Sequence, residues 1–244
     1  MKAVILCGGR GIIDSYSGAR IPKGMMRVGD RPVISHVMQT LSMSGVRDFV
    51  LALGEYGEVI RDYLRQSKSC GDWKIECVDT GRKVGTGFRL VQCQPSIGDG
   101  HFLLTYSDCL CNIRADDLVS YHKRRDKILT VTGVQPQWRF GVFRTMGNEV
   151  ISYNPQPHLV SDQGYINGGY MVMESTIFDH IRAAPDCSLE RETFTTLARE
   201  RQVAVYLHAG YWQAIDGERE LEIVNAQTAN ARPWLFESDA CHAS

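Results

Sequence analysis

Glycines follow the first apolar run of the chain, in the segment CGGRG at positions 7–11. Backbone N–H groups of glycine can approach a phosphate closely because no Cβ stands in the way. The spacing fits neither the dinucleotide motif G-x-G-x-x-G nor a Walker loop. Lys23, which follows Pro22, could reach the same anion as a point charge. The segment therefore predicts a phosphate-binding loop, with a plain glycine turn and a surface lysine as the alternative.

Two apolar runs end in a carboxylate, since Asp108 closes HFLLTYSD and Asp216 closes GYWQAID. A carboxylate at the end of a buried strand is costly unless it meets a cation or another partner. If the two aspartates face one another, they would bind Mg²⁺ or Mn²⁺, which prefer oxygen ligands. A helix cap is an equally good interpretation of Asp216, because GERELEIVNAQ follows it.

The segment YINGGYMVME places Asn167 and two glycines ahead of a predicted strand. It is either a hairpin turn or a place where sugar hydroxyls meet an amide and bare backbone. Tyr165 and Trp212 could form a wall for the sugar, although aromatic residues beside strands usually belong to the core. A lone histidine is more often structural than catalytic. The acid–base candidates are His208, Glu190, Glu192 and Asp162.

The charge balance is close to neutral, with 27 Lys and Arg against 28 Asp and Glu. No global field attracts nucleic acid or an anionic membrane, so the expected partner is a small molecule. No run approaches the roughly 20 apolar residues of a membrane helix, and the N-terminal run is too short for a signal peptide. We therefore expect a cytoplasmic protein. The C-x-C pair Cys109 and Cys111 lacks a second pair at matching spacing, so reduced core thiols are expected rather than a metal site.

Short apolar runs alternate with longer amphipathic ones over the first 135 residues. The alternation predicts an α/β fold with a mostly parallel sheet and helices on both faces. After residue 135, shorter pieces predict an antiparallel addition and closing elements. We expect one domain over 1–244, with a nucleotide-binding part at 1–135 and a sugar-side lobe at 136–244. Strands are predicted at 2–7, 48–53, 73–78, 101–106 and 128–134, and helices at 32–45, 56–67, 87–94 and 115–126.

Nine segments resemble those of the sugar nucleotidyltransferases in order and spacing, most closely the glucose-1-phosphate cytidylyltransferases. They are MKAVILCGG, IPKGM, VGDRPVISHVM, VDTG, YSD, VTGVQPQWRFG, YINGGYMVME, ERE and YWQAID. The resemblance spans almost the whole chain. It implies a Rossmann-like nucleotidyltransferase fold, a nucleotide-sugar substrate and a homo-oligomer as one option.

The resemblance also implies a role for individual positions. The nucleotide would contact Cys7, Gly8, Gly9, Arg10, Gly11, Lys23, Asp79, Thr80, Gly81, Thr86 and Gly87. Together with Tyr165 and Trp212, the expected sugar contacts are Asn167, Gly168, Glu190 and Arg191. Asp108 and Asp216 would hold Mg²⁺ or Mn²⁺, and with Lys23 they are the expected catalytic residues. Neither flavin nor NAD is expected, because the sequence holds no dinucleotide motif.

The sequence departs from this family at two contacts with phosphate. The Thr and Arg of the family's first loop are Ile12 and Ile13 here, and the lysine of its E-K-P segment is Gln156. Two cations on opposite sides of the reacting phosphorus are therefore missing. The loss of one preorganised donor commonly lowers a rate about 10²-fold. Arg20 could replace the missing arginine, which keeps ordinary nucleotidyl transfer open.

These losses favour a metal-dependent enzyme that acts on a preformed nucleotide sugar. We expect a non-redox mutase, in which the diphosphate leaves C1 of the sugar and returns after the ring changes between its pyranose and furanose forms. Hydrolysis of the same bond stays open. The alternatives are sugar-1-phosphate nucleotidyl transfer of the cytidylyl type, which releases pyrophosphate, and a non-catalytic sensor of nucleotide sugars.

Overall fold

A seven-stranded mixed sheet forms the centre of the computed structural model, which describes residues 1–9, 12–13, 18–67, 72–135, 142–154, 164–228 and 231–236. Every neighbouring pair of strands is parallel except the two pairs that β13 makes. The predicted α/β class with a mostly parallel sheet is confirmed. In spatial order the strands are β14 (Val203–Leu207), β10 (Leu129–Val134), β13 (Ile166–Glu174), β8 (His101–Tyr106), β1 (Lys2–Leu6), β6 (Asp48–Leu53) and β7 (Lys74–Asp79).

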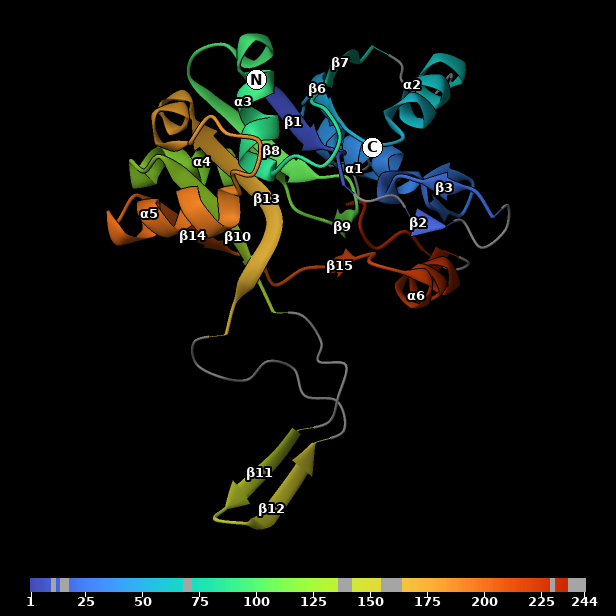
Figure 1. Ribbon diagram of the computed structural model, residues 1–244. Helices are drawn as coiled ribbons and strands as arrows, with labels where there is room; N and C mark the ends of the chain where they lie inside the picture. Colours follow the sequence, from blue (N-terminus) through green and yellow to red (C-terminus); the bar gives the residue numbers. More distant parts are fainter. Residues whose placement is uncertain are drawn as a thin grey trace, which may run out of the picture.

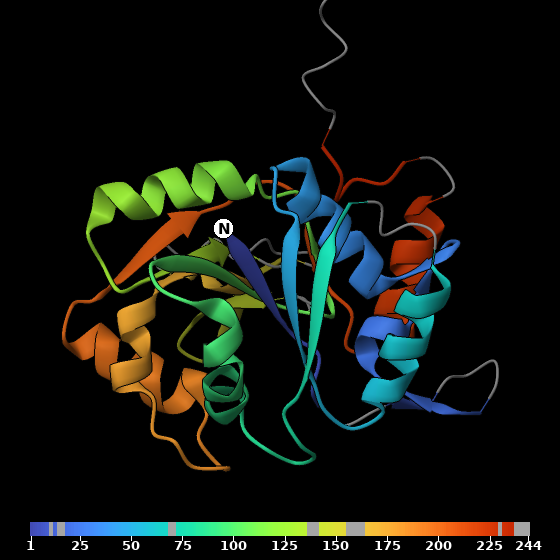
Figure 2. The same ribbon diagram turned by 90° about the horizontal axis from the view of Figure 1, so that it is seen from above.

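Helices cover both faces of this sheet (Figure 2). Side chains alternate along β1, so Ala3 and Ile5 pack on one face and Val4 and Leu6 on the other. The face of Ala3 and Ile5 packs against α1 (Val33–Met43), α2 (Gly57–Gln66), α4 (Ala115–Arg125) and α6 (Glu218–Thr228). The face of Val4 and Leu6 packs against α3 (Thr86–Ile97), the 3-10 helix Ser175–His180 and α5 (Phe194–Arg199). None of the helices in the described ranges is long and apolar enough to cross a membrane.

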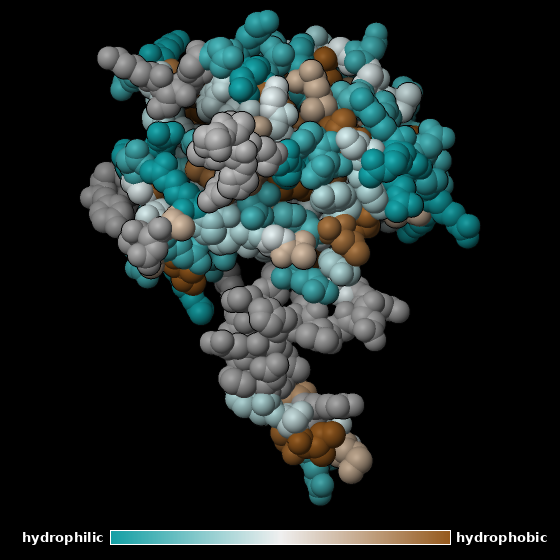
Figure 3. All heavy atoms as spheres, turned by 180° about the vertical axis from the view of Figure 1, so that it is seen from behind, coloured by the Kyte–Doolittle hydropathy of each residue, from teal (hydrophilic) through white to brown (hydrophobic). Residues whose placement is uncertain are grey.

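The second half of the chain enters the same sheet. β13 lies between β8 and β10, and β14 forms the edge beside β10. Of the shorter pieces expected after residue 135, β11 (Val142–Met146) and β12 (Glu149–Asn154) form the separate antiparallel hairpin, which projects from the body (Figure 1). Phe143, Met146 and Ile151 on this hairpin are more than half exposed, and Figure 3 shows apolar residues there.

Within the described residues, three further short ribbons lie outside the central sheet, and the first of them joins segments that are far apart in the sequence. β9 (Cys109–Cys111), directly after β8, pairs with β15 (Trp212–Ala214). β4 (Arg27–Val28) pairs with β5 (Arg31–Pro32), after a 3-10 turn at Lys23–Met25. β2 (Ile12–Ile13) pairs with β3 (Arg20–Ile21). The first of these ribbons places the residues that precede β9 beside those that follow β15.

Leu104 tests the packing of the central strand. It is fully buried on β8, between β1 and β13. We expect Leu104→Ala to lower the free energy of unfolding by about 3 kcal/mol, because the lost side chain leaves a cavity. Urea unfolding followed by far-UV circular dichroism measures the change. Ile223→Ala, at a side chain that is 43% exposed, is the control and should cost less than about 1 kcal/mol. Equal losses in the two variants would contradict this packing.

Candidate functional site

Lys23 lies between Asp108 and Asp216, which come from distant parts of the chain. Its Nζ is 2.7 Å from Oδ1 of Asp216 and 3.7 Å from Oδ2 of Asp108. Asp108 stands just beyond the end of β8, and its backbone oxygen accepts a hydrogen bond of 2.9 Å from the N–H of Ile215. The β9–β15 ribbon therefore brings together the two aspartates that the sequence singled out.

The charges in this cluster act on one another. Partial burial works to lower the pKa of Lys23, but the hydrogen bond to Asp216 and the charge of Asp108 outweigh it, so the pKa lies above its usual value. Burial raises the pKa of Asp108, and the charge of Asp216 adds to the rise against the opposing effect of Lys23. Two carboxylates that converge on one cationic nitrogen form a donor set that suits a hard divalent cation. The side chains present therefore fit the expected Mg²⁺ or Mn²⁺.

Further protein ligands for such an ion are not provided by the described part of the chain, which holds no group of three or more His, Cys, Asp or Glu side chains placed to bind a metal. Cys109 and Cys111 are buried in β9, and burial raises the pKa of both thiols. They are protonated core groups, as the sequence predicts. The remaining ligands of a cation at Asp108 and Asp216 would come from substrate phosphates and water.

A buried guanidinium supports the first glycine loop. Arg89 on α3 is 2% exposed, and its Nη1 donates to Oγ1 of Thr80 at 2.6 Å and to the backbone oxygen of Gly81 at 2.9 Å. A Cβ on Gly8 would overlap this guanidinium, and a Cβ on Gly54 would lie 2.7 Å from Nη1. Both glycines are therefore needed for the close approach. Arg89 is not among the residues predicted from the sequence, although a charged residue among the apolar positions of the predicted helix 87–94 was the available signal.

Several nucleotide candidates lie at the ends of β1 and β7, while Thr86 and Gly87 begin α3. Cys7 is 5% exposed and its N–H donates to the backbone oxygen of Ala52, so it faces the core. Oδ1 of Asp79 accepts the N–H of Gly81 at 3.0 Å, and Gly81 has a φ of 86°. The guanidinium of Arg89 donates to the backbone oxygen of Gly81 in this turn at the end of β7. Arg10 and Gly11 lie outside the described residues.

Glu190 accepts hydrogen bonds from three hydroxyl groups. Thr86 donates to Oε2 at 2.7 Å and Ser188 to the same oxygen at 2.9 Å, while Tyr106 donates to Oε1. Burial by itself would raise the pKa of Glu190, but the bonds from Thr86 and Tyr106 outweigh it, so the pKa lies below its usual value. A carboxylate with its lone pairs occupied in this way is an anchor between the start of α3 and the end of β8, rather than a proton acceptor.

Three other predicted residues lie near Glu190 and have structural contacts. The N–H of Gly87 donates to the backbone oxygen of Cys187 at 3.0 Å, and a Cβ on Gly87 would lie 2.6 Å from the sulfur of Cys187. Glu192 accepts two hydrogen bonds from Arg182, at 2.9 and 3.0 Å. Arg191 is exposed. Gly87 therefore allows the close packing of α3 on the segment before Glu190.

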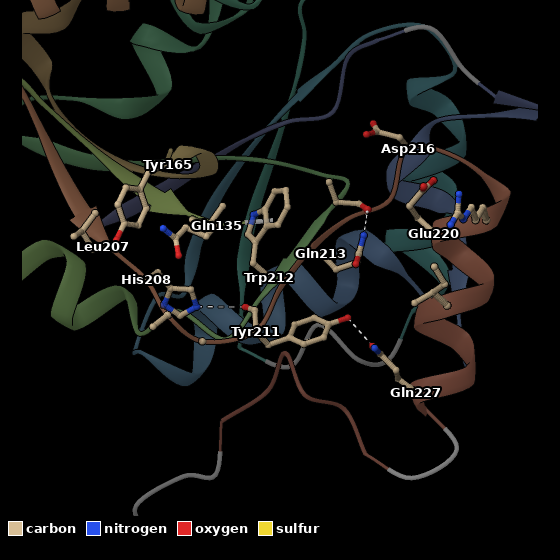
Figure 4. A pocket seen from close by; sticks show the side chains of 16 residues that line it. Gln135, Tyr165, Leu207, His208, Tyr211, Trp212, Gln213, Asp216, Glu220 and Gln227 are labelled. Atoms are coloured by element: carbon tan, nitrogen blue, oxygen red, sulfur yellow. Dashed lines mark hydrogen bonds between the residues drawn. The ribbon is translucent and has the colours of Figure 1, made fainter. Parts of the chain in front are cut away.

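A pocket of about 790 Å³ opens beside Asp216 (Figure 4). Trp212 stands in its wall, fixed by a hydrogen bond of 2.8 Å from Nε1 to the backbone oxygen of Gly168. Tyr165 lies at the end away from Asp216. The two aromatic residues singled out from the sequence therefore line one pocket with a predicted metal ligand. Its polar lining also includes Gln135, His208, Gln213, Arg219 and Gln227.

His208 lines this pocket but is held by its neighbours. Its Nε2 lies 3.0 Å from Oδ1 of Asn112 and 3.3 Å from the backbone oxygen of Tyr211, so Nε2 carries the proton. Burial lowers the pKa of His208, which keeps the ring neutral. These contacts favour the structural interpretation of this histidine. Asn167 accepts the N–H of Gly169 at 2.9 Å in a local turn, while Asp162 and Gln156 lie outside the described residues.

Comparison with known proteins points to nucleotidyl transfer. The family model described as "Nucleotidyl transferase" matches residues 2–218. A protein of Bacillus subtilis (strain 168) with the name probable glucose-1-phosphate cytidylyltransferase is 35% identical, over 92% of this chain and 95% of the relative. The glucose-1-phosphate cytidylyltransferase of Salmonella typhi is 30% identical, over 90% of this chain and 93% of its own. The crystal structure of HddC from Yersinia pseudotuberculosis shares the fold, with a TM-score of 0.72, 20% identity, and coverage of 93% of this chain and 99% of that one.

The expectation of a mutase that acts on a preformed nucleotide sugar is wrong. The matching family model and the relatives are nucleotidyl transferases over nearly the whole chain. The expectation rested on two missing cations, at Ile13 and Gln156, and gave these single positions more weight than the order of all the other motifs. Lys23 keeps a cation beside both aspartates. The similarities support the alternative, which is transfer of a nucleotidyl group to a sugar 1-phosphate.

Glu190→Gln tests the hydroxyl anchor. The amide nitrogen would face a hydroxyl that now donates, so we expect the free energy of unfolding at pH 7 to fall by about 2 kcal/mol. The pKa of Glu190 is lower in the folded state than its ordinary value of 4.5, so its stabilisation is present above pH 4.5 and is lost as the pH falls through the lowered pKa. Urea unfolding at pH 7 and at about pH 3.5 measures the free energy of unfolding of the wild type and of Glu190→Gln. The difference between them should be smaller at the acid pH.

The control for this experiment is Glu222→Gln, at an exposed position on α6. It should leave the free energy of unfolding unchanged at both pH values, because surface substitutions have small effects. A difference between wild type and Glu190→Gln that is the same at both pH values would contradict the role given to the charge of Glu190.

Proposed function

Because the chain belongs to the nucleotidyl transferase family, we propose that it transfers a nucleoside monophosphate group to a sugar 1-phosphate, with CTP and a hexose 1-phosphate as substrates. The observation that carries this proposal is the meeting of Lys23 with Asp108 and Asp216 beside the pocket. The choice of CTP draws on the similarity to two glucose-1-phosphate cytidylyltransferases over nine-tenths of the chain.

The reaction joins the sugar phosphate to the α-phosphorus of the nucleotide. A phosphate oxygen of the sugar 1-phosphate attacks this phosphorus, the bond from phosphorus to the oxygen that bridges to the β-phosphate breaks, and pyrophosphate leaves with the bonding electrons. The attacking oxygen is already anionic, so no proton has to be removed from it. The protein therefore has to position two polyanions and stabilise their charge. A site with a lysine and two carboxylates that can hold a divalent cation suits this task. The reaction needs no general base, which agrees with a neutral His208 held by hydrogen bonds.

On the nucleotide side, we assign the phosphates to Lys23 and to the backbone of Gly8 and Gly9. Lys23 would act as a point charge, which could pass from the carboxylates to a phosphate oxygen when the nucleotide binds. Thr80 and Gly81 would line the base and ribose. Arg89 packs against Gly8 and donates hydrogen bonds to Thr80 and Gly81, so it would keep the loop after β1 and the loop after β7 at a fixed distance.

Asp108 and Asp216 are the residues that would hold Mg²⁺ or Mn²⁺. When bound, the ion would neutralise charge on the phosphates and on the departing pyrophosphate. The carboxylates themselves orient Lys23, whose Nζ they share. The same three side chains therefore serve both the ion and the nucleotide.

On the acceptor side, we assign the sugar 1-phosphate to the pocket beside Asp216. Trp212 and Tyr165 would pack against the sugar ring. Asn167 and the backbone of Gly168 would form hydrogen bonds with its hydroxyl groups. Arg219 lines the same pocket. It would provide a cation for the phosphate of the acceptor, for which the sequence has Gln156 in place of the lysine that the resemblance implies.

Pyrophosphate release tests the proposed reaction. Each of the four common nucleoside triphosphates is paired with a panel of hexose 1-phosphates in the presence of Mg²⁺, and the products are followed by a coupled pyrophosphate assay and phosphorus NMR. We expect CTP to give pyrophosphate and a CDP-hexose in equal amounts. Release with another base would correct the choice of CTP alone. A panel in which no pair gives pyrophosphate would refute the transferase proposal.

Lys23→Met and Asp108→Asn test the roles given to the charged cluster. We expect each variant to lower kcat/KM for pyrophosphate release by about 10²-fold or more, because each removes a preorganised charge beside the reacting phosphates. Lys74→Met and Asp72→Asn are the matched controls, because both side chains are exposed and belong to other elements. Activity of Asp108→Asn within a few-fold of wild type would show that Asp108 is a structural residue.

A further inference from the structure

The side-chain amide of Asn225 joins the helix that follows Asp216 to the ribbon that follows Lys23. Oδ1 of Asn225 accepts the N–H of Gly29 at 2.8 Å, and Nδ2 donates to the backbone oxygen of Arg27 at 3.1 Å. We propose that Asn225 is a positioning residue for nucleotidyl transfer, which acts by holding Lys23 at its place beside Asp216. This inference rests on the proposed function of the site.

Among the described residues, two polar side-chain contacts join the two segments directly. One is the ion pair between Nζ of Lys23 and Oδ1 of Asp216, at 2.7 Å. The other is the amide of Asn225 on α6, which donates to the backbone oxygen of Arg27 in β4. Lys23 begins the 3-10 turn Lys23–Met25, and only three residues, 24–26, separate it from β4. On the other side, Gly217 alone separates Asp216 from the start of α6. A shift of α6 against β4 would therefore move Asp216 against Lys23.

The amide of Asn225 fixes the orientation of the ribbon as well as its distance. It pairs with one N–H and one C=O of the β4–β5 ribbon, in the manner of a peptide group in a neighbouring strand. The ribbon itself is only two residue pairs long. Gly29, in its turn, has a φ of 61°, a conformation that glycine adopts readily. A ribbon this short has few bonds of its own, so an external pair of hydrogen bonds contributes much of its order.

The packing of α6 does not depend on this amide. Val224 is fully buried, in the same apolar core as Val28 and Met26. Arg232 also holds the turn from outside, by a 2.9 Å ion pair with Asp30. Loss of the Asn225 amide should therefore leave the helix folded and in place while it loosens the register of the ribbon. This separates a positioning role from a general role in stability.

The predicted effect is on turnover more than on substrate affinity. A misplacement of about 1 Å at a reacting centre can lower a rate about 10²-fold. We expect Asn225→Leu, which removes both hydrogen bonds, to lower kcat about tenfold with a smaller change in KM. Asn225→Asp keeps the acceptor for Gly29 and loses the donor to Arg27, so its kcat should lie between that of the wild type and that of Asn225→Leu. Tyr121→Phe, which removes one hydrogen bond to the backbone of Val205 on the far edge of the sheet, is the control and should leave kcat unchanged.

A double-mutant cycle with Lys23→Met tests whether Asn225 acts through Lys23. If it does, Asn225→Leu should lower kcat in the wild-type background and have no further effect in the Lys23→Met background. Effects of the two substitutions that multiply in the double variant would overturn the proposal. So would an Asn225→Leu variant with kcat within twofold of an active wild type.

Two further measurements do not depend on turnover. Hydrogen exchange of the Gly29 amide should be about tenfold faster or more in Asn225→Leu, since this N–H loses its acceptor. Binding of Mn²⁺ alone, followed by water proton relaxation, should become tighter, because the ammonium of Lys23 competes with the ion for the two carboxylates and Asn225→Leu loosens its hold on them. If no substrate pair reacts, the proposed function fails and these two measurements still decide the role of Asn225. Unchanged exchange at Gly29 or unchanged Mn²⁺ binding would overturn it.

Discussion

The candidate site depends on one electrostatic constraint, which is that two aspartates at close range need a cation between them. Nζ of Lys23 supplies it, at 2.7 Å from Asp216 and 3.7 Å from Asp108. Asp108 follows β8, Asp216 follows β15 and Lys23 precedes β4. Their geometry therefore exists only when the sheet, the β9–β15 ribbon and the β4–β5 ribbon all take their places. In the proposed reaction, the same arrangement would receive a divalent ion and a phosphate.

Buried polar side chains behind the loops give the rest of the site its shape. Arg89 occupies the space beneath Gly8 and bonds the turn at Thr80 and Gly81, so the ends of β1 and β7 keep a fixed spacing. Glu190 does the same between α3 and β8 through three hydroxyl donors. Each of these groups would be costly to bury without its partners. Their bonds therefore specify one arrangement of the loops, which a purely apolar contact would not do.

The departures from the family motifs have to be weighed against what is kept. Ile13 and Gln156 remove two cations that the family uses, and taken alone they suggest a different reaction. The family match over residues 2–218 and the retained cluster of Lys23, Asp108 and Asp216 favour nucleotidyl transfer with a redistributed positive charge. Electrostatic stabilisation of a polyanion depends on the summed field at the phosphates, so cations at other positions can contribute to it.

The alternating strands and helices of the first 135 residues could be predicted from the sequence, because hydrophobic periodicity is a local property. The sequence also singled out Asp108 and Asp216, which the fold brings to the same lysine. It could not show that β13 lies between β8 and β10, that Arg89 lies under Gly8, or that Asn225 reaches Gly29. Each of these contacts joins residues far apart in the chain, and only the closing of the sheet and its ribbons brings them within hydrogen-bonding or packing distance. Tertiary structure decided them because no local pattern of residues encodes such a distance.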